Sequence, residues 1–572
     1  MSQYLLTLVI FSPLIGVVAL LTIGRAAPST VRRVALGASL LTLFLVLWAA
    51  QQFYGSTDLQ ADGTTRHYFL TEHAPWLAMV GGSESPIDIA YRVGIDGISL
   101  WLLVLAGLLM PLAVWSSFTA IKTRTTEYYI LLLLLQVGLL GVFCAMDVLL
   151  FFVFFEFTLV PLFFLIGIWG GPERKKAAYK FFIYTIAGSV LTFAGIVYLA
   201  YFSYQATGTV TLQLEALVQL ARDGRIPFNV QWWLFLAFAA GFSIKVPLFP
   251  FHTWLPLAHT EAPTAGSVIL AGVLLKLGTY GFCRLSIPML PDAALALAPL
   301  LAVLAIIGIL YTALAAWVQT DAKKLVAYSS VSHLGFCILG MFSLTMAGLT
   351  GSVLYMVNHG LSTGALFLLV GYIYERYHTR SIDEIGGLAR RMPWLAFFLV
   401  FFTLSSIGLP GLNGFVGEFL VLLGTAISPE QRLARGVGPL GFGYAIPAAG
   451  GIILGAVYML WMCQRILFGP VKEPPHTPDT SAGLTVDLTR REIAIVAPLA
   501  LACLAIGVYP KPLLNDFEKA ISYNILAPTV AGETTENLKQ GSPNTWSMAT
   551  EPQNQWMKID EKVIHSMGSG TE

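Results

Sequence analysis

The sequence predicts an all-α membrane protein, a polytopic bundle of about 14 transmembrane helices. Charged residues make up 11% of the 572 residues, against about 25% in an ordinary soluble protein. Hydrophobic residues reach 56%, and the mean hydropathy is +0.73. Apolar runs such as YYILLLLLQVGLLGVF (128–143) do not alternate as the strands of a membrane barrel would, so the spans are helices.

A hydrocarbon core about 30 Å thick requires roughly 20 apolar residues in each helix. The first such stretch is not a cleaved signal peptide, because no positive residue precedes it and Arg25 follows it. Lys and Arg gather in the loops after odd-numbered spans, which predicts that both termini lie on the outer side. The spans are expected at 4–23, 34–53, 98–120, 127–146, 148–170, 181–204, 231–257, 264–287, 293–317, 324–344, 348–374, 393–427, 442–467 and 492–510.

Three segments fall outside these spans. Residues 54–95 are expected to form an outward loop, and 211–222 (TLQLEALVQLAR) has the apolar spacing of a helix on the membrane surface. Residues 512–572 are polar and rich in Gly, Ser and Thr, which is typical of a loosely held tail without a specific role.

The sequence shows no local cofactor site. The five cysteines include no CxxC spacing and the nine histidines no HExxH pair, which argues against a zinc or iron–sulfur site. Neither a GxGxxG turn nor a Walker loop is present, so no nucleotide site is visible. The net charge of +1 gives no reason to expect nucleic acid as a partner. We expect this chain to bring neither a cofactor nor a metal of its own.

Four ionisable residues lie deep in the apolar spans: Glu156, Lys245, Lys276 and Glu418. A charge at the bilayer centre costs about 2.5–3.5 kcal/mol even on the lenient insertion scale. These side chains are therefore expected to face the interior of the bundle, where they pair or meet water. An inert spacer could replace them with leucine and gain stability, so they indicate a function.

Glu156 and Lys245 each lie beside a helix break. Pro161 cannot donate to the carbonyl of Phe157, which loosens the helix just after Glu156. Two prolines in KVPLFPF (245–251) do the same after Lys245. We expect the two side chains to pair, and a buried neutral carboxyl or a purely structural ion pair remain the alternatives.

Lys276 begins a polar stripe along one helix face, because Tyr280 and Arg284 follow at i+4 and i+8. The apolar and small residues before Lys276 leave it too deep for its ammonium to reach the membrane surface.

His333 and His359 lie between Lys276 and Glu418 in the chain. Each histidine is either a relay group or an ordinary hydrogen-bonding partner between helices. Acidic and basic neighbours with coupled affinities suit proton transfer, whereas a sodium or potassium filter would use rings of carbonyls or carboxylates. We therefore predict a proton relay.

Two distant spans repeat one pattern. SIKVPLFPFHTWL (243–255) and SIGLPGLNGFVGEFL (406–420) both place proline and small or polar residues in mid-membrane, five spans apart. Discontinuous helices at matching positions indicate an inverted-repeat transporter and mark its ion path.

At these residues the chain resembles the antiporter-like family of respiratory complex I, which also includes multisubunit cation/proton antiporters and membrane-bound hydrogenases. The resemblance covers roughly residues 1–510. The matching stretches are GIDGISLWLLVL (94–105), FFVFFEFTLVPLFFLIG (151–167), FSIKVPLFPFHTWLPLAHTEAPTAGSVILAGVLLKLGTYG (242–281), TDAKKLVAYSSVSHLG (320–335), NHGLSTGALFLLVG (358–371) and GLPGLNGFVGEF (408–419).

The resemblance implies two inverted five-helix repeats, at 127–290 and 291–470, with discontinuous helices 7 and 12. It places helices 1–3 with the outward loop at 1–126, helix 14 and its preceding loop at 471–511, and the tail at 512–572. By the same resemblance, Glu156, Lys245, Lys276 and Glu418 form the proton relay, with His333 and His359 as further candidates. Most relatives carry lysine where this chain has Glu418, which favours one branch of complex I subunits over the stand-alone antiporters.

The implied function is that of a proton-translocating membrane-arm subunit of NADH:quinone oxidoreductase in the bacterial inner membrane, with both termini on the periplasmic side. FMN and iron–sulfur clusters, like the sites for NADH and quinone, would belong to partner subunits, and two antiporter-like neighbours would flank the chain in the arm. A subunit of a cation/proton antiporter or of a membrane-bound hydrogenase is the alternative.

Overall fold

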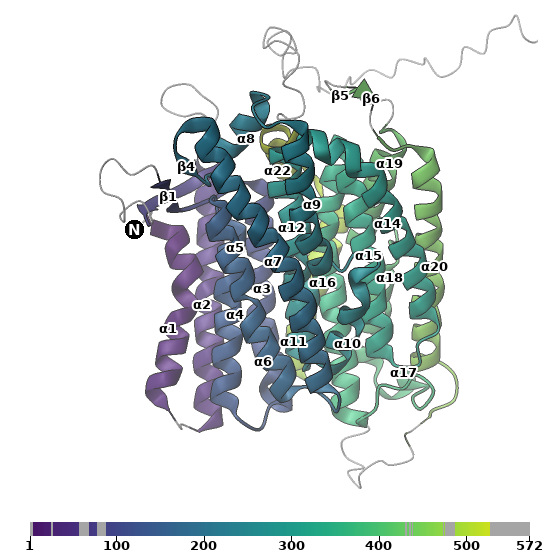
Figure 1. Ribbon diagram of the computed structural model, residues 1–572. Coiled ribbons are helices and arrows are strands. Elements are labelled where there is room, and N and C mark those ends of the chain that lie inside the picture. The colour runs from purple at the N-terminus through teal and green to yellow at the C-terminus, as the bar shows by residue number, and fades with distance from the viewer. Residues whose placement is uncertain are drawn as a thin grey trace, which may run out of the picture. The chain divides into compact units, whose positions relative to one another are not determined.

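The computed structural model describes residues 4–24, 27–56, 68–76, 87–428, 432–433, 436–437, 439–472, 474 and 487–526. Within them, long helices stand side by side (Figure 1), so the prediction of an all-α membrane bundle is confirmed. Twelve of the described helices are long and apolar enough to cross a membrane. The other two predicted spans, 231–257 and 393–427, are divided into shorter helical pieces.

The N-terminal part consists of α1 (Leu5–Ile23), α2 (Pro28–Gly55) and α3 (Gly97–Ala120). In the described part of the expected outward loop, β1 (Phe69–Pro75) pairs antiparallel with β3 (Ala90–Ile95), and β2 (Ile87–Asp88) lies between them in the chain. The rest of that loop, at 57–67 and 77–86, lies outside the described residues. Asp96 caps α3, because its Oδ1 accepts from the backbone N–H groups of Ile98 and Ser99.

Three of the membrane spans in the first predicted repeat are not regular α-helices. Spans five and seven of the bundle break after α5 and α9, and span eight contains two π-helical segments, η4 and η5. The elements are α4 (Thr125–Cys144), α5 (Val148–Phe157), α6 (Leu159–Trp169), α7 (Arg174–Thr207), β4 (Val210–Thr211), α8 (Leu214–Arg222), α9 (Phe228–Lys245), η3 (Phe251–Thr253), α10 (Trp254–Glu261), α11 (Thr264–Ile269), η4 (Leu270–Leu274), α12 (Leu275–Gly281), η5 (Phe282–Ser286) and α13 (Ile287–Met289).

The rest of the bundle contains one further broken span, between α18 and α19. Its elements are α14 (Pro291–Trp317), α15 (Ala322–Phe342), α16 (Met346–Tyr377), α17 (Leu388–Arg391), α18 (Pro393–Ser406), α19 (Asn413–Ala426), β5 (Arg432–Leu433), β6 (Gly436–Val437), α20 (Phe442–Leu467), α21 (Arg490–Val508), α22 (Lys511–Ile521) and η6 (Ser522–Leu526). The predicted breaks at spans 7 and 12 are therefore present, and the inverted relation of the two repeats stays a prediction.

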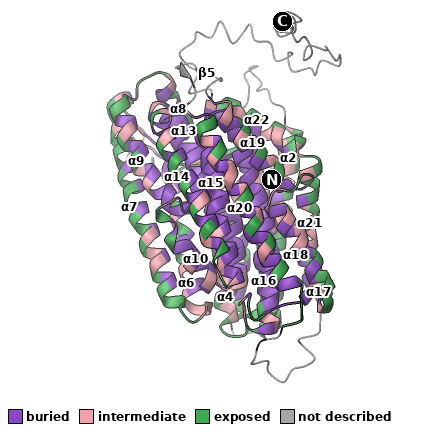
Figure 2. Ribbon diagram, turned by 90° about the vertical axis from the view of Figure 1, so that its right-hand side faces the viewer, coloured by how far each residue is buried: buried purple, intermediate pink, exposed green. Residues whose placement is uncertain are grey.

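The helices at the centre of the bundle are buried on every side. The 18-residue apolar windows of Thr264–Met289 and of α16 are 100% buried, and that of α15 is 94% buried. By contrast, α1 and α21 bury less than half of theirs and expose apolar side chains, as lipid-facing helices do. Figure 2 shows the buried residues concentrated along α15 and α16. The central helices carry Lys276, His333 and His359.

Residues 512–526 differ from the loose tail that the composition suggests. Here α22 packs against α3 and α16, and Phe517 is fully buried. The side chain of Asp516 accepts hydrogen bonds from Trp101 Nε1 and Tyr54 Oη. The apolar positions 513, 517, 520 and 521 lie on one helix face, and this spacing is hidden in a composition dominated by polar residues. The remainder of the expected tail, 527–572, lies outside the described residues.

Candidate functional site

Glu156 lies at a break between two short helices. Helix α5 ends at Phe157 and α6 begins at Leu159, as the missing N–H of Pro161 predicts. The carboxylate of Glu156 is half-buried and accepts a hydrogen bond from Ser189 Oγ of α7. The break is packed tightly, because a Cβ on Gly138 would lie 2.8 Å from Thr158 Cγ2.

Lys245 is the last residue of α9 and reaches the same break from the other side. It is 2% exposed, its Nζ donates to Thr158 Oγ1 at 3.4 Å, and the ammonium lies 4.6 Å from the ring centroid of Phe155. No ion pair within 4.0 Å joins Lys245 to Glu156, so the expected pair is not in direct contact. Thr158 stands at the junction, and no sequence pattern marked it.

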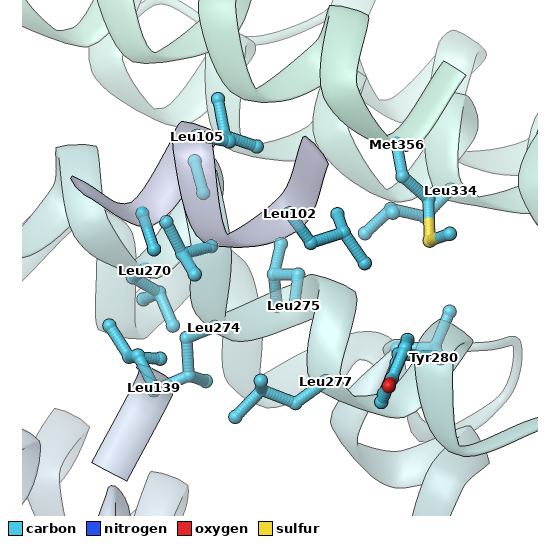
Figure 3. Packing of buried hydrophobic residues seen from close by; sticks show 14 of the residues in the cluster. Leu102, Leu105, Leu139, Leu270, Leu274, Leu275, Leu277, Tyr280, Leu334 and Met356 are labelled. Atoms are coloured by element: carbon cyan, nitrogen blue, oxygen red, sulfur yellow. The ribbon is translucent and has the colours of Figure 1, made fainter. Parts of the chain in front are cut away.

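Lys276 is fully buried in α12, between η4 and η5. Its Nζ lies 2.7 Å from His359 Nδ1 and also donates to the carbonyl of Ala271. The leucines of the same stretch, at 270, 274, 275 and 277, pack in the apolar core of the bundle (Figure 3), so this helix is buried from bulk water. Lys276 therefore contacts His359 directly, although His333 comes first in the chain.

The two helices that carry Lys245 and Lys276 are also in close contact. A Cβ on Gly278 of α12 would lie 2.7 Å from Val246 Cγ2 and 2.8 Å from the carbonyl oxygen of Phe242, at the end of α9. This glycine lets the two backbones approach, so the helix that carries Lys276 packs directly against the end of the helix that carries Lys245.

The two histidines face each other across α15 and α16. The ring centroids of His333 and His359 are 5.7 Å apart, and both residues are buried. His333 Nε2 lies 3.2 Å from Ser406 Oγ, at the end of α18. His359 Nε2 and Asn358 Oδ1 have no hydrogen-bond partner among the described residues.

Both histidines line a cavity of about 10 Å³, close to the room that one water molecule requires. Its walls are polar and come from α15, α16, α18 and α19. The lining residues are His333, Tyr355, Asn358, His359, Ser362, Ser405, Ser406 and Gly414.

Tyr355 joins His333 to Glu418. Its Oη lies 2.5 Å from His333 Nδ1 and donates to Glu418 Oε1, and the direct distance from His333 Nδ1 to Glu418 Oε1 is 3.9 Å. Sequence reasoning missed this tyrosine, although it lies four residues before His359 and hence on the same face of α16.

Glu418 is buried in α19, just after the break of span 12. Gly408, in the turn between α18 and α19, has a φ of +74° and no side chain to obstruct the carboxylate. A Cβ at this position would lie 2.3 Å from Glu418 Oε2. The turn thus brings the backbone against the carboxylate, which only glycine permits.

The predicted site residues form two groups. Lys276, His359, His333 and Glu418 lie in one series of contacts across four helices, completed by Tyr355. Glu156 and Lys245 meet at a separate break beside it. Each serine in AYSSVSH donates to a backbone carbonyl, and only Ser332 does so to another helix, at Ile309 of α14; Ser329 and Ser330 both donate to Val326 within α15.

Comparisons with known proteins show which family the chain resembles. Residues 145–431 match the family model described as "NADH:quinone oxidoreductase/Mrp antiporter, TM". The chain is 41% identical over 543 residues to NADH-quinone oxidoreductase subunit M of Rhodobacter capsulatus, covering 92% of this chain and 96% of the relative. It is also 41% identical over 523 residues to NADH-ubiquinone oxidoreductase chain 4 of Prototheca wickerhamii, covering 91% and 94%. A chain in the structure of respiratory complex I from Thermus thermophilus with bound NADH matches with a TM-score of 0.74 and 30% identity, covering 90% and 99%.

Proposed function

The chain belongs to the NADH:quinone oxidoreductase/Mrp antiporter family as a counterpart of subunit M and chain 4, and on this basis we propose that its buried polar series is a proton relay. It is an antiporter-like membrane-arm subunit of proton-pumping complex I and therefore part of an enzyme. The relay residues are Lys276, His359, His333, Tyr355 and Glu418.

The observation that carries this proposal is the short path from Lys276 to Glu418. Lys276 Nζ and His359 Nδ1 are 2.7 Å apart, within the distance for direct proton transfer. Tyr355 lies between His333 and Glu418 in the same way. Only the step between the two histidines lacks a direct bond, and the cavity there has the size and polarity to admit one water molecule.

Glu156 and Lys245 control the proton on Lys276 in this proposal. When the two side chains separate, as they are here, the positive charge of Lys245 is less compensated and repels a proton on Lys276. The proton then moves to His359 and on to Glu418. When Glu156 approaches Lys245, the repulsion falls and Lys276 takes up the next proton. Thr158 and Ser189, which hold the two side chains apart, have to release them.

The electrons are handled elsewhere in the complex. The family to which this membrane subunit belongs carries no redox cofactors. We propose that FMN, the iron–sulfur clusters and the sites for NADH and quinone lie in partner subunits, and that two antiporter-like subunits flank this one. The chain is a multi-pass membrane protein. We propose that it lies in the bacterial inner membrane, and the positive-inside bias supports both termini on the periplasmic side.

Replacing Lys276 with methionine in the intact complex tests the relay. We expect Lys276→Met to abolish proton pumping in membrane vesicles and to depress NADH:quinone turnover, because the first relay group is lost while the volume is kept. Ser330→Ala is the matched control, since Ser330 is buried in α15 but donates only within its own helix. Unchanged pumping in assembled Lys276→Met complexes would remove Lys276 from the proton path.

Glu156→Gln tests the control step separately. The amide keeps the volume and the contact with Ser189 but cannot compensate the charge of Lys245. We expect assembled complexes that pump fewer protons per electron than the wild type. Pumping per electron equal to that of the wild type would contradict the control role.

A further inference from the structure

Asn358 and His359, neighbours in α16, each carry a buried polar atom that the described residues leave unsatisfied. Asn358 Oδ1 and His359 Nε2 have no hydrogen-bond partner among these residues, although the two side chains belong to residues that are only 1% and 2% exposed. Both residues line the cavity of about 10 Å³ that His333 also lines. Buried polar groups are nearly always hydrogen-bonded, so the two atoms indicate a ligand in this cavity.

The orientation of the Asn358 amide is fixed by the break in span 12. Asn358 Nδ2 donates to the backbone carbonyl of Asn413 at 2.6 Å, at the start of α19. A carbonyl oxygen only accepts hydrogen bonds, so the atom that faces it is the amide nitrogen and the other is Oδ1. Asn413 Nδ2 donates in return to the carbonyl of Asn358 at 3.4 Å, and Ser405 Oγ donates to Asn413 Oδ1 at 2.5 Å. Asn358 Oδ1 is therefore a fixed acceptor that needs a donor.

The two histidines present complementary ring nitrogens. Lys276 Nζ lies 2.7 Å from His359 Nδ1, and an ammonium can only donate, so Nδ1 accepts and Nε2 carries the proton of the neutral ring. Tyr355 donates to Glu418 and therefore accepts from His333 Nδ1, which leaves Nε2 of that neutral ring without a proton. Nε2 of His359 is thus a donor, whereas Nε2 of His333 is an acceptor.

We propose that Asn358 positions the water molecule that joins the two histidines of the relay. This water accepts from His359 Nε2 and donates one of its protons to Asn358 Oδ1. Its other proton points to Ser406 Oγ, which also lines the cavity and lies 3.2 Å from His333 Nε2. A buried water typically makes about three hydrogen bonds, and this site provides that many partners. Asn358 does not carry the proton and is a positioning residue.

The proton balance closes with this water in place. One proton leaves the ammonium of Lys276 and one arrives at the carboxylate of Glu418, so both groups become neutral. Between them, each group takes up one proton and releases another. The water takes the Nε2 proton of His359 and passes one of its own to Ser406, whose hydroxyl proton moves to His333 Nε2. Without a fixed acceptor beside it the water would turn freely, and the step between the rings would lose its alignment.

This inference rests on the proposed relay and concerns the one step there that lacks a direct bond. The test is the rate of proton pumping in vesicles, normalised to the amount of assembled complex. Asn358→Leu has nearly the same shape but no acceptor, so we expect a several-fold lower rate. Asn358→Asp, in its protonated form, donates to the Asn413 carbonyl and keeps an acceptor oxygen, so we expect it to retain most of the pumping. Asn358→Ala, which adds no bulk, serves if the leucine variant does not assemble.

Thr363→Val is the matched control. Thr363 belongs to the same helix, is 1% exposed, and has a hydroxyl without a partner in the described part of the chain, but it is not among the residues that line the cavity. We expect its pumping to equal that of the wild type.

Infrared difference spectra during turnover provide a readout that packing alone does not change. We expect a water O–H band that shifts in heavy-oxygen water, is present in the wild type and in Asn358→Asp, and is absent in Asn358→Leu.

Wild-type pumping in assembled Asn358→Leu complexes would overturn the proposal. So would equal losses in Asn358→Leu and Asn358→Asp, because the acceptor oxygen would then be irrelevant, and so would an isotope-sensitive water band that persists in Asn358→Leu. Failure of the relay itself has a different signature, namely pumping that survives Lys276→Met.

Discussion

At the scale of single residues, the site depends on a tyrosine that no sequence pattern marked. The four membrane charges and two histidines are visible in the sequence, because ionisable residues are rare in apolar spans. Tyrosine is common in such spans, so the role of Tyr355 emerges only from its contacts with His333 and Glu418. The same holds for Thr158, which stands where Glu156 and Lys245 had been expected to pair directly.

Tyr355→Phe should lower the rate of proton pumping by roughly an order of magnitude. This loss is somewhat smaller than the rate factor that one positioned proton-transfer group usually contributes. The ring and its packing remain, whereas the hydroxyl that joins His333 to Glu418 is lost. Tyr372→Phe is a matched control, since this buried tyrosine lies in the same helix and its hydroxyl has no partner among the described residues. The measurement is pumping per electron in vesicles, and equal values for the two variants would contradict the role of Tyr355.

Gly408→Ala should impair pumping more than Gly411→Ala. Both glycines have positive φ, +74° and +91°, so both substitutions introduce comparable backbone strain. Only at 408 does the added Cβ meet the carboxylate of Glu418, whereas nothing lies within 4 Å at 411. Activity normalised to the amount of assembled complex checks this difference, and equal losses in the two variants would show that strain alone is responsible.

At the scale of elements, the sequence predicts the broken helices well and the π-helical segments not at all. Prolines mark the breaks after Glu156, Lys245 and Ser406, because proline removes a backbone donor wherever it occurs. No residue type requires the π-helical segments at 270–274 and 282–286, which depend on packing against neighbouring helices. Yet the first of them places the Ala271 carbonyl at Lys276 Nζ, so it shapes the site directly.

The cap of α5 should make the protein's stability depend on pH. Asp147 caps this helix by accepting from the N–H groups of Leu149 and Leu150, and burial raises its pKa to about 6. The folded state thus favours the protonated carboxyl of Asp147. The stability that this carboxyl contributes is full below about pH 4, its pKa in the unfolded state, and is lost as the pH rises through about 6, its pKa in the folded state.

Asp147→Asn keeps a cap acceptor and removes the charge. We therefore expect it to raise the thermal denaturation temperature of the solubilised complex at pH 7.5 and to raise it much less at pH 4.5. An equal shift at both pH values would contradict the linkage.

At the scale of the whole molecule, the bundle hides its polar residues in its most buried helices and leaves apolar faces for lipid. Composition alone predicts this division. It could not predict that the polar series runs across α12, α16, α15 and α19 rather than along one helix, because that depends on tertiary packing. In the proposed relay, protons would accordingly move laterally across these helices.

The most direct test of this account is infrared difference spectroscopy of the intact complex during NADH-driven turnover. We expect a carboxyl band that disappears in Glu418→Gln and is also lost in Lys276→Met, because the proton reaching Glu418 comes from Lys276. A band assigned to Glu418 that persists unchanged in Lys276→Met would show that the two residues are not joined, and would contradict the relay.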